Sequence, residues 1–548
     1  MRLVDLTVDI PASSHPRGVL QDPGKPSRWK TAEFRFYSIS VFIVVLIMAW
    51  IPIALSSSTN PNYPRFQSKL SRGWIAGRSV DNSDAQYRGF RSNFIPLTLA
   101  AGAYLLAKFG RTRLSPNARD NMYLIPFNLG ASVVMLIALH GSSALKILPI
   151  LTINYLISKS WGGSRFGPLM SWIFNVSILF LNDRYSGYNF RDIAPSLSHL
   201  DTFKGLYPRW HIGFNITMLR LVSFSMDYYW ACNMAGDLDH TNSSTLNEKQ
   251  RQTMAHPERM YSYPNYISYV LYPPLYLAGP VMTFNDYIWQ HRHPLSISRS
   301  VVLGYSIRFL ISLLTMEFIL HFMYVVAMKN TQAWLGSTPA QIGMIGVWNL
   351  MIVWLKLLII WRFFRLWAMV DGIDAPENMV RCPANNYSTL GFWRSWHRSY
   401  NLWLSRYIYI PLGGAKNVGL NTLLVFTFVA LWHDLTFRLL AWGWLASLFV
   451  APELIAQYLL PESKYGVKPW YRHVCAVGGV LNMLMLLAAN LVGFVIGPDG
   501  VRFFVEQLFG TTEGLRFLAA VAVCFFAAVQ LMFEYREEEK RKGIQRRC

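Results

Sequence analysis

Residues 36–55, FYSISVFIVVLIMAWIPIAL, form an apolar run without a charged side chain. A helix needs about 20 such residues to cross the hydrocarbon core of a bilayer. Inside lipid a helix satisfies its own backbone hydrogen bonds, whereas an open strand leaves them unpaired. This run therefore predicts a membrane-spanning helix and decides the fold class of the chain.

The rest of the chain repeats this pattern. Long apolar runs occupy residues 122–139, 301–328, 343–360, 418–431, 474–496 and 515–532, and shorter ones occupy residues 94–107, 145–157, 168–181, 266–282 and 439–456. Of the 548 residues, 53% are hydrophobic and 15% are charged, which is outside the range of soluble globular proteins. We predict an all-α polytopic membrane protein with roughly ten to twelve transmembrane helices.

The chain divides into three parts. Residues 1–35 contain prolines and mixed charge and are expected to form a flexible polar tail; residues 36–533 form one multi-span membrane domain; residues 534–548, EYREEEKRKGIQRRC, form a solvated charged tail. No cleavable signal peptide precedes the first run, so residues 36–55 should act as an uncleaved signal anchor. This places the protein in the endoplasmic reticulum membrane, with the plasma membrane as a second location.

The net charge of +21 raises the question of nucleic acid. The basic residues are scattered through loops, with no basic helix or aromatic recognition module, so we expect no nucleic-acid partner. Basic residues beside spans instead anchor them to anionic lipid. The five cysteines have no paired spacing, so neither a disulfide framework nor a metal site is expected.

The middle of the chain combines apolar helices with many ionisable residues: Arg220, Asp227, Asp286, Lys356, Arg362, Arg365, Asp371, Asp374, Arg394, His397, Arg398 and Arg406. Ionisable groups at bilayer depth face a bundle interior or a water-filled cavity. We therefore expect a polar tunnel that contains the reaction chamber. The prolines in residues 272–280 should break a span beside it, where protein satisfies the freed backbone groups.

Two histidines are the main candidates for chemistry. His433 ends the apolar run 420–431, where we expect it to be buried, and His397 lies in WHRSYN, residues 396–401. An imidazole has a pKa near neutrality, so in its neutral form it can take a proton from an attacking alcohol. A single histidine on an apolar face is more often structural, but a second imidazole with an amide, Asn401, one turn beyond it favours a catalytic pair.

The other histidines serve as a comparison. His140 and His321 lie in apolar segments without polar neighbours in sequence, so we expect structural roles for both. His291 and His293 form an H-x-H without carboxylate or cysteine partners at a ligand-like spacing, so no metal is expected there. The sequence motifs of serine hydrolases, P-loop NTPases and zinc proteases do not occur.

The residues around the two histidines carry a family resemblance. Residues 392–403 (FWRSWHRSYNLW), then 407–414 (YIYIPLGG), then 432–434 (WHD) resemble the core signature of the membrane-bound O-acyltransferase (MBOAT) superfamily. Residues 220–229 and 272–280 resemble upstream blocks of the same superfamily. The resemblance implies an MBOAT-type helical bundle with an internal chamber.

Further segments resemble one branch of that superfamily, the fungal glycerol-uptake proteins: residues 80–88, 278–287, 371–379 and 537–541. This likeness covers nearly the whole chain after about Lys30. It implies an acyltransferase that remodels the lipid of glycosylphosphatidylinositol (GPI) anchors in the endoplasmic reticulum. Such an enzyme places a long or very long acyl chain from acyl-CoA on a hydroxyl of a lyso-GPI-anchor lipid carried by a protein.

The resemblance also implies roles for residues. The invariant histidine of the family matches His433, which we expect to be the general base, and the second catalytic position matches His397. That second position is often Asn or Asp, so His397 is a departure, and its task stays open between the acyl carbonyl and the developing thiolate. Asn401, Asp434 and Trp432 are expected to support the pair.

Acyl-CoA is expected as a co-substrate, with no permanently bound cofactor. The cations Arg394, Arg398, Arg406 and Lys416 suit the phosphates of coenzyme A, although snorkelling to lipid headgroups explains them equally well. Trp396 and Trp403 are expected beside the acyl chain, or as anchors at the membrane interface.

Two other classes of function stay open at this point. A transporter of glycerol or another small polyol also uses polar groups in broken helices, but the chain shows no inverted repeat. A scaffold without catalysis is the third class, and the presence of His433 argues against it.

Overall fold

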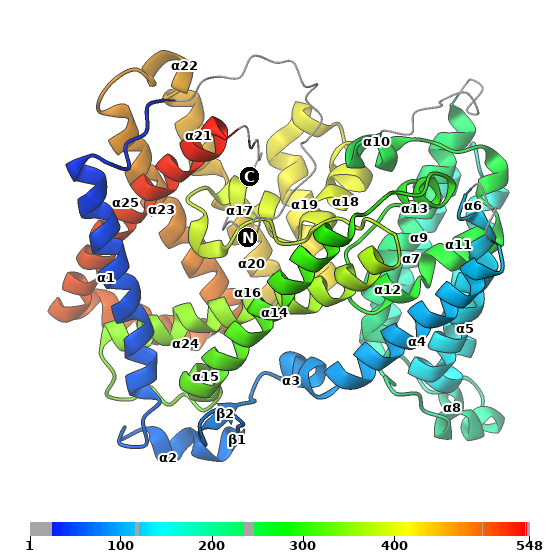
Figure 1. Cartoon of the computed structure of the whole chain (residues 1–548), viewed down its shortest axis with the longest axis horizontal. Helices are drawn as coiled ribbons and strands as arrows, with labels where there is room; N and C mark the ends of the chain where they lie inside the picture. Colours follow the sequence, from blue (N-terminus) through cyan, green and yellow to red (C-terminus); the bar gives the residue numbers. More distant parts are fainter. Residues whose placement is uncertain (1–24, 116–119, 235–245, 496, 543, 545–548) are drawn as a thin grey trace.

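The structure is a computed structural model, and it describes residues 25–115, 120–234, 246–495, 497–542 and 544. The described chain is almost wholly helical (Figure 1). Its one sheet is a short antiparallel pair of strands, β1 (Leu70–Arg72) and β2 (Ser79–Asp81), with Leu70 opposite Asp81.

The helices follow one another along the chain. The first half contains α1 (Ala32–Leu55), α2 (Tyr63–Phe66), α3 (Ala85–Ser92), α4 (Phe94–Arg113), α5 (Ile125–His140), α6 (Ala144–Ser160), α7 (Phe166–Arg184), α8 (Phe190–Ile193), α9 (Trp210–Asn233), α10 (Glu248–Thr253), α11 (Tyr263–Val270), α12 (Pro273–Tyr276) and α13 (Phe284–Arg292). The second half contains α14 (Arg299–Phe322), α15 (Val325–Asn330), α16 (Pro339–Val370), α17 (Thr389–Ser395), α18 (Arg398–Leu404), α19 (Val418–His433), α20 (Phe437–Leu448), α21 (Ala451–Leu459), α22 (Glu462–Tyr465), α23 (Tyr471–Asn490), α24 (Gly497–Phe509) and α25 (Thr512–Arg541).

Within the described residues, eight helical stretches are long and apolar enough to cross a membrane, which confirms the all-α polytopic class. They are Ala32–Leu55, Met122–Ser160, Arg299–Phe322, Pro339–Val370, Gly414–His433, Phe437–Leu459, Tyr471–Gly493 and Thr512–Arg541. The number is below the expected ten to twelve for three reasons. The predicted runs 122–139 and 145–157 count as one stretch, the run 266–282 is broken into short helices, and α4 and α7 are more polar. Helices α7 and α9 bury residues such as Asn175 and Asp227 against their neighbours.

The bundle has two sides joined by two long helices. In Figure 1, α1 lies beside α23 and α25 at one side, α4 to α7 and α9 gather at the other, and α14 and α16 run through the middle. Helix α16 begins sharply because the Thr338 side chain caps it and Pro339 occupies its first turn. The central helices therefore connect two walls, and α19 packs on α20 behind them.

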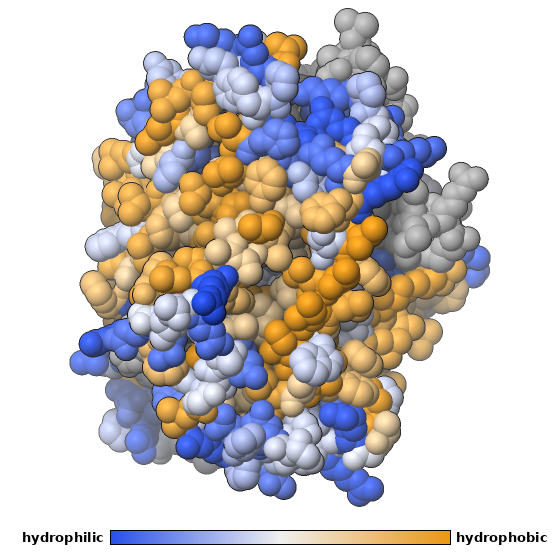
Figure 2. All heavy atoms as spheres, turned by 90° about the vertical axis from the view of Figure 1, so that its left-hand side faces the viewer, coloured by the Kyte–Doolittle hydropathy of each residue, from blue (hydrophilic) through white to orange (hydrophobic). Residues whose placement is uncertain are grey.

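The outer surface is apolar where lipid would meet it. Helix α1 exposes Phe36, Phe42 and Trp50. Figure 2 shows apolar residues across the middle of this face and polar residues gathered towards its top and bottom. A soluble monomer rarely exposes an apolar surface of this extent, whereas a membrane protein must.

The break predicted within residues 272–280 is confirmed. Helices α11, α12 and α13 replace a single span, and the backbone carbonyls freed by the break are paired. The fully buried guanidinium of Arg220 donates to the carbonyl of Val270 (2.8 Å) and to that of Leu275. The arginine from α9 thus makes the broken span tolerable inside the bundle.

Both predicted tails differ from expectation where the structure describes them. Helix α1 begins at Ala32, inside the expected N-terminal tail, of which residues 1–24 lie outside the described residues. Helix α25 continues through the C-terminal segment to Arg541, and the expectation that this segment is solvated is wrong for Glu534 and Glu539. Glu534 and Glu539 are buried there by contacts with distant parts of the chain.

Candidate active site

The backbone of His397 is held in an unusual conformation. This residue joins α17 to α18 with φ 44° and ψ 50°, the left-handed region that favours glycine. The two residues after it are fixed by the buried Asn378. The backbone N–H of Arg398 donates to the backbone carbonyl of Asn378 (3.0 Å), and that of Ser399 donates to its side-chain Oδ1 (3.1 Å). Such strain persists where the surroundings determine the conformation, which is common at functional sites.

The ring of His397 lies among aromatic side chains. It stacks on Trp361 of α16 with centroids 4.4 Å apart and an angle of 24°, and it lies 5.1 Å from the ring of Tyr400. The hydroxyl of Tyr400 is buried and has no hydrogen-bond partner within the described residues. His397 is therefore held by ring contacts and not by a polar partner.

His433 is the last residue of α19, and it follows an anchored tryptophan. The indole Nε1 of Trp432 donates to the carbonyl of Asn215 on α9, and the side-chain amide of Asn215 donates to the carbonyl of Trp432, both at 2.8 Å. His433 lies deep within the protein, as expected, but its ring is accessible to solvent because α19 ends at this residue. The ring still lies 6.3 Å from that of Trp442 on α20.

The structure brings both imidazoles to the indole of Trp432. The ring of His433 lies 4.8 Å from it and that of His397 lies 6.5 Å from it. Burial, and next the charge of a protonated His433, lower the pKa of His397 below its usual value.

The ring nitrogens of these two histidines differ from those of the buried histidines His140, His291 and His321. His140 bonds Tyr207 and Tyr276, and His321 bonds the Trp74 amide and the Glu317 carbonyl, as expected of structural residues. His291 likewise contacts Asn128 and the Tyr287 carbonyl. Within the described chain, neither His397 nor His433 has a hydrogen-bond partner for its ring, so both stay available to a substrate.

The expected supporting residues contribute less directly. The backbone N–H of Asn401 donates to the carbonyl of His397 (3.0 Å), but no hydrogen bond joins the Asn401 side chain to either imidazole in the described structure. Asp434 is exposed in the turn after α19. Trp432 has the clearer role, because it is the common neighbour of both rings.

The four expected cations fall into two pairs. Arg398 binds Glu248 of α10 through both ends of its guanidinium (3.0 and 3.1 Å), and Arg406 binds the buried Asp227 (2.8 Å). Arg394 and Lys416 are exposed. The second pair is free to meet phosphates, whereas the first is engaged within the protein.

The two tryptophans also differ. Trp396 is half-buried and stacks on Phe392 at 5.5 Å. Trp403 is fully buried and donates its indole N–H to the Leu219 carbonyl (2.8 Å), so it belongs to the packed core.

Most of the remaining ionisable residues form ion pairs with one another or with other buried groups. The pairs are Arg251–Asp286, Lys108–Asp371, Arg365–Asp374 and Lys356–Asp84. Burial raises the pKa of Asp286 on α13 to about 6, although Arg251 opposes this shift. A buried charge normally needs such a partner. Within the described residues, no cluster of His, Cys, Asp and Glu has the arrangement of a metal site.

Several residues of the site were not expected from the sequence. Trp361, Asn378, Tyr400 and Asn215 each contact the histidines or their backbone neighbours. Asn378 lies in residues 371–379, a segment already singled out by its family resemblance, and that was the available signal.

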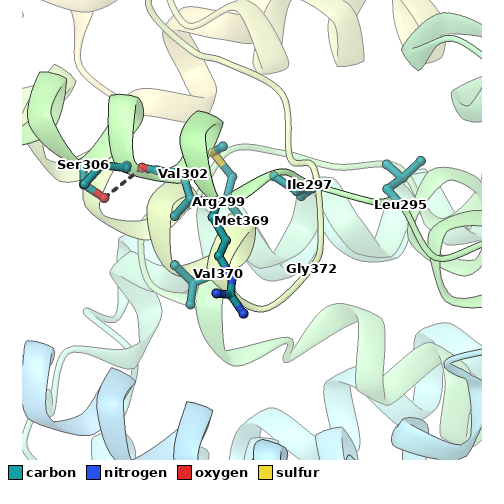
Figure 3. Close-up of a pocket in the computed structure, with 9 residues that line it drawn as sticks. Leu295, Ile297, Arg299, Val302, Ser306, Met369, Val370 and Gly372 are labelled. Carbon is teal, nitrogen blue, oxygen red and sulfur yellow. Dashed lines mark hydrogen bonds between the residues drawn. The ribbon is translucent and has the colours of Figure 1, made fainter.

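A surface groove lies elsewhere, between the start of α14 and the end of α16 (Figure 3). It is lined by Leu295, Ile297, Arg299, Val302, Leu303, Ser306, Met369, Val370 and Gly372. Its one hydroxyl, that of Ser306, already donates to the Val302 carbonyl (2.9 Å). This lining has no acid–base pair, so the groove does not compete with the histidines as a reaction centre.

Comparisons with known proteins bear on the same region. Residues 171–497 match the membrane-bound O-acyltransferase family. The chain is 48% identical over 536 residues to the membrane-bound O-acyltransferase GUP1 of Saccharomyces cerevisiae, covering 96% of this chain and 94% of the relative. It is 39% identical over 549 residues to the membrane-bound O-acyltransferase gup1 of Schizosaccharomyces pombe, covering 98% and 94%. A more distant relative is the mouse protein-cysteine N-palmitoyltransferase HHAT, 27% identical over 272 residues, or 45% of this chain and 53% of the relative.

Proposed function

Because this chain belongs to the membrane-bound O-acyltransferase family and is an acyl-transferring enzyme, we propose that His433 and His397 carry out the transfer. One observation carries the proposal: both imidazoles meet at Trp432, and their ring nitrogens have no hydrogen-bond partner among the residues that the structure describes. A pair of unoccupied imidazoles is suited to moving a proton between an alcohol and a leaving group.

The transfer is balanced in atoms and protons. The acceptor hydroxyl gives its proton to the neutral imidazole of His433 while its oxygen attacks the thioester carbonyl of acyl-CoA. The new C–O ester bond forms, the C–S bond breaks, and the proton passes from the imidazolium to the thiolate of coenzyme A. General acid–base catalysis of this kind contributes roughly 10²- to 10⁴-fold to a rate.

His397 is proposed to act on the carbonyl side. It is half-buried and stacked on Trp361, so its position is fixed more firmly than that of the exposed His433. A fixed group near the carbonyl stabilises developing charge without reorganising during the reaction. The exposed His433, at the turn between α19 and α20, is the better placed of the two to receive an acceptor from outside.

We propose that Arg394 and Lys416 bind the phosphates of acyl-CoA. Both are exposed, whereas the guanidinium groups of Arg398 and Arg406 are bound to carboxylates. Trp396, half-buried beside His397 in sequence, is proposed to contact the donor. An acyl-CoA co-substrate, with no resident cofactor, is part of this proposal.

The proposed acceptor is a hydroxyl of a lyso-GPI-anchor lipid, and the proposed acyl chain is long or very long. Support comes from the resemblance of four segments to the fungal glycerol-uptake branch and from relatives matched over nearly their whole length. The proposed location is the endoplasmic reticulum membrane. The comparisons do not favour the transporter alternative, because the relatives are named as acyltransferases.

The test is transfer by the purified full chain in lipid nanodiscs. Acyl-CoA of several chain lengths is offered with a panel of lyso-lipid acceptors, including lyso-phosphatidylinositol and a lyso-GPI anchor, and products are measured by mass spectrometry. We expect an esterified anchor, preferred over the other acceptors and made fastest with the longer donors. Preference for another acceptor would overturn the assignment of the lyso-GPI anchor as substrate, while the proposed acyl transfer by the two histidines would stand.

The matched control is His433→Ala in the same nanodiscs. We expect loss of transfer with an unchanged melting temperature, because the side chain is exposed and has no hydrogen-bond partner in the described structure. A variant that retained transfer would overturn the role of His433.

A further inference from the structure

The end of α25 makes a buried ion pair with a distant loop. The guanidinium of Arg381 donates to both carboxylate oxygens of Glu539, at 3.1 and 2.8 Å, and both side chains are buried. The two preceding glutamates are different. Glu537 pairs with Lys540 and Glu538 pairs with Arg541, within the same stretch of helix and partly exposed.

A second contact supports the first. One turn earlier, Arg536 donates to the side-chain Oδ1 of Asn385 (3.1 Å) and to its backbone carbonyl (2.6 Å). Arg381 and Asn385 both lie in the loop of residues 371–388, which joins α16 to α17. We call Arg381, Asn385, Arg536 and Glu539 the C-terminal clamp.

The clamped loop is the one that fixes His397. Asn378 receives the backbone N–H groups of Arg398 and Ser399, on the C-terminal side of the histidine. On its N-terminal side, the N–H of Val380 donates to the carbonyl of Ser395 (3.2 Å), and the Asn386 amide donates to the Ser395 hydroxyl (3.3 Å). Residues on both sides of His397 are therefore tied to the loop held by the clamp.

The end of α25 is itself anchored to the segment before α1. Glu534 accepts from the backbone N–H of Arg28 (3.0 Å), and Arg541 donates to the carbonyl of Lys25 (2.7 Å). The clamp is thus fixed on the side away from the loop, and a displacement of the loop is resisted at both ends.

We propose that Glu539 is a positioning residue for acyl transfer, which holds the 371–388 loop so that His397 keeps its left-handed backbone and its place at Trp432. This inference rests on the proposed function, because it concerns the productive geometry of His397. A displacement of about 1 Å at a reacting group can lower a rate by about a hundredfold.

The first test compares Glu539→Gln with Glu538→Gln, the same change one residue earlier. We expect Glu539→Gln to lower kcat by about tenfold or more with little change in KM for acyl-CoA, since no donor contact is removed. Glu538→Gln should keep the kcat of the parent protein. Equal kcat values in the two variants would overturn the proposal.

The double variant Arg381→Gln/Glu539→Gln separates positioning from folding. It removes both charges of the pair together, so we expect its melting temperature to return towards that of the parent protein. Its kcat should stay low because the loop has lost both hydrogen bonds between the Arg381 guanidinium and the Glu539 carboxylate. A double variant with the kcat of the parent protein would show that the pair serves stability alone, and it would overturn the inference. This test remains decisive even if the single variant Glu539→Gln does not fold.

A readout that does not need activity distinguishes this inference from the proposed function. In hydrogen–deuterium exchange of the full chain, Glu539→Gln should increase exchange in residues 378–386 and 395–400, and Glu538→Gln should not. If the parent protein transfers no acyl group but exchange rises in this pattern, the proposed function fails and the clamp stands as a structural contact. If transfer is observed and exchange is unchanged, the inference fails alone.

Discussion

Two groups of polar residues lie along α18 and the turn that follows it, and they are built in opposite ways. In the first group Arg398 and Arg406 form ion pairs with Glu248 and Asp227, at 3.0 and 2.8 Å. In the second group His397 lies among Trp361, Tyr400 and Trp432 without a polar partner in the described structure. We call the first group the ion-pair scaffold and the second the aromatic pocket.

The difference teaches how charge is used in this bundle. Each carboxylate of the ion-pair scaffold is satisfied by a guanidinium, so these groups fix distances between helices and have little capacity left for a substrate. The aromatic pocket has the opposite character, because within the described residues neither the His397 ring nor the Tyr400 hydroxyl has a hydrogen-bond partner. Unsatisfied groups cost stability, and that cost is expected where a ligand supplies the missing partner.

The largest expected effect separates two histidines of the same chemistry. His433→Gln should lower the transfer rate by about a thousandfold and leave the melting temperature unchanged. His140→Gln should lower the melting temperature, because its ring bonds Tyr207 and Tyr276, and keep the rate per folded molecule. Rates and melting curves of both purified variants check this contrast, which would be broken if the two variants behaved alike.

The next effect concerns the ion-pair scaffold. Asp227→Asn leaves the Arg406 guanidinium buried without its carboxylate, so we expect a loss of roughly 3 kcal/mol in unfolding free energy. The readout is thermal unfolding in detergent micelles. The double variant Asp227→Asn/Arg406→Met is the control, since it removes both charges, and it should regain most of that loss. A stable single variant would contradict the scaffold role.

A smaller effect is expected from the exposed cations. Arg394→Gln/Lys416→Gln should raise the KM for acyl-CoA by about tenfold with kcat nearly unchanged, because exposed phosphate contacts contribute binding and not chemistry. The effect should weaken as salt is added. Arg502→Gln, at another exposed arginine, is the matched control and should leave KM unchanged. Unchanged KM in the double variant would place the donor phosphates elsewhere.

The smallest effect is a pH dependence of stability. The pKa of His397 is lowered from 6.5 in the folded chain, so below pH 6.5 the unfolded chain binds more protons than the folded one. The free energy of unfolding should therefore decrease as the pH is lowered. This group should account for about 1 kcal/mol of that decrease between pH 6.5 and 5.5. Melting curves of the parent protein and of His397→Gln test this, and the variant should show a shallower decline. Parallel declines would contradict the assignment.

The sequence predicts the aromatic pocket better than the ion-pair scaffold. Hydropathy predicts the helices, the prolines of residues 272–280 predict the broken span, and the motifs around His397 and His433 predict the pair. The partners of Arg398 and Arg406 are 150 and 179 positions away, so no local pattern shows that these cations are already paired. The sequence therefore offers all four cations to coenzyme A or to lipid headgroups alike, although two of them are engaged in ion pairs.

Two other features depend on distant contacts and were not predicted. The left-handed backbone of His397 requires Asn378, whose role is visible only when the loop folds against α18. The acidic end of the chain has the composition of a solvated tail, and only the match between Glu539 and Arg381 makes it part of the core. Composition describes how a segment interacts with water, whereas burial depends on a partner that composition does not name.

The reciprocal hydrogen bonds between Asn215 and Trp432 have a consequence for motion. Because one residue of α9 binds both the indole and the backbone of Trp432, a rotation of α19 about its own axis would break both bonds at once. The C-terminal end of α19 is therefore held in one orientation relative to α9. Any movement that admits an acceptor to His433 is therefore expected in the turn that joins α19 to α20, since the end of α19 is held against α9.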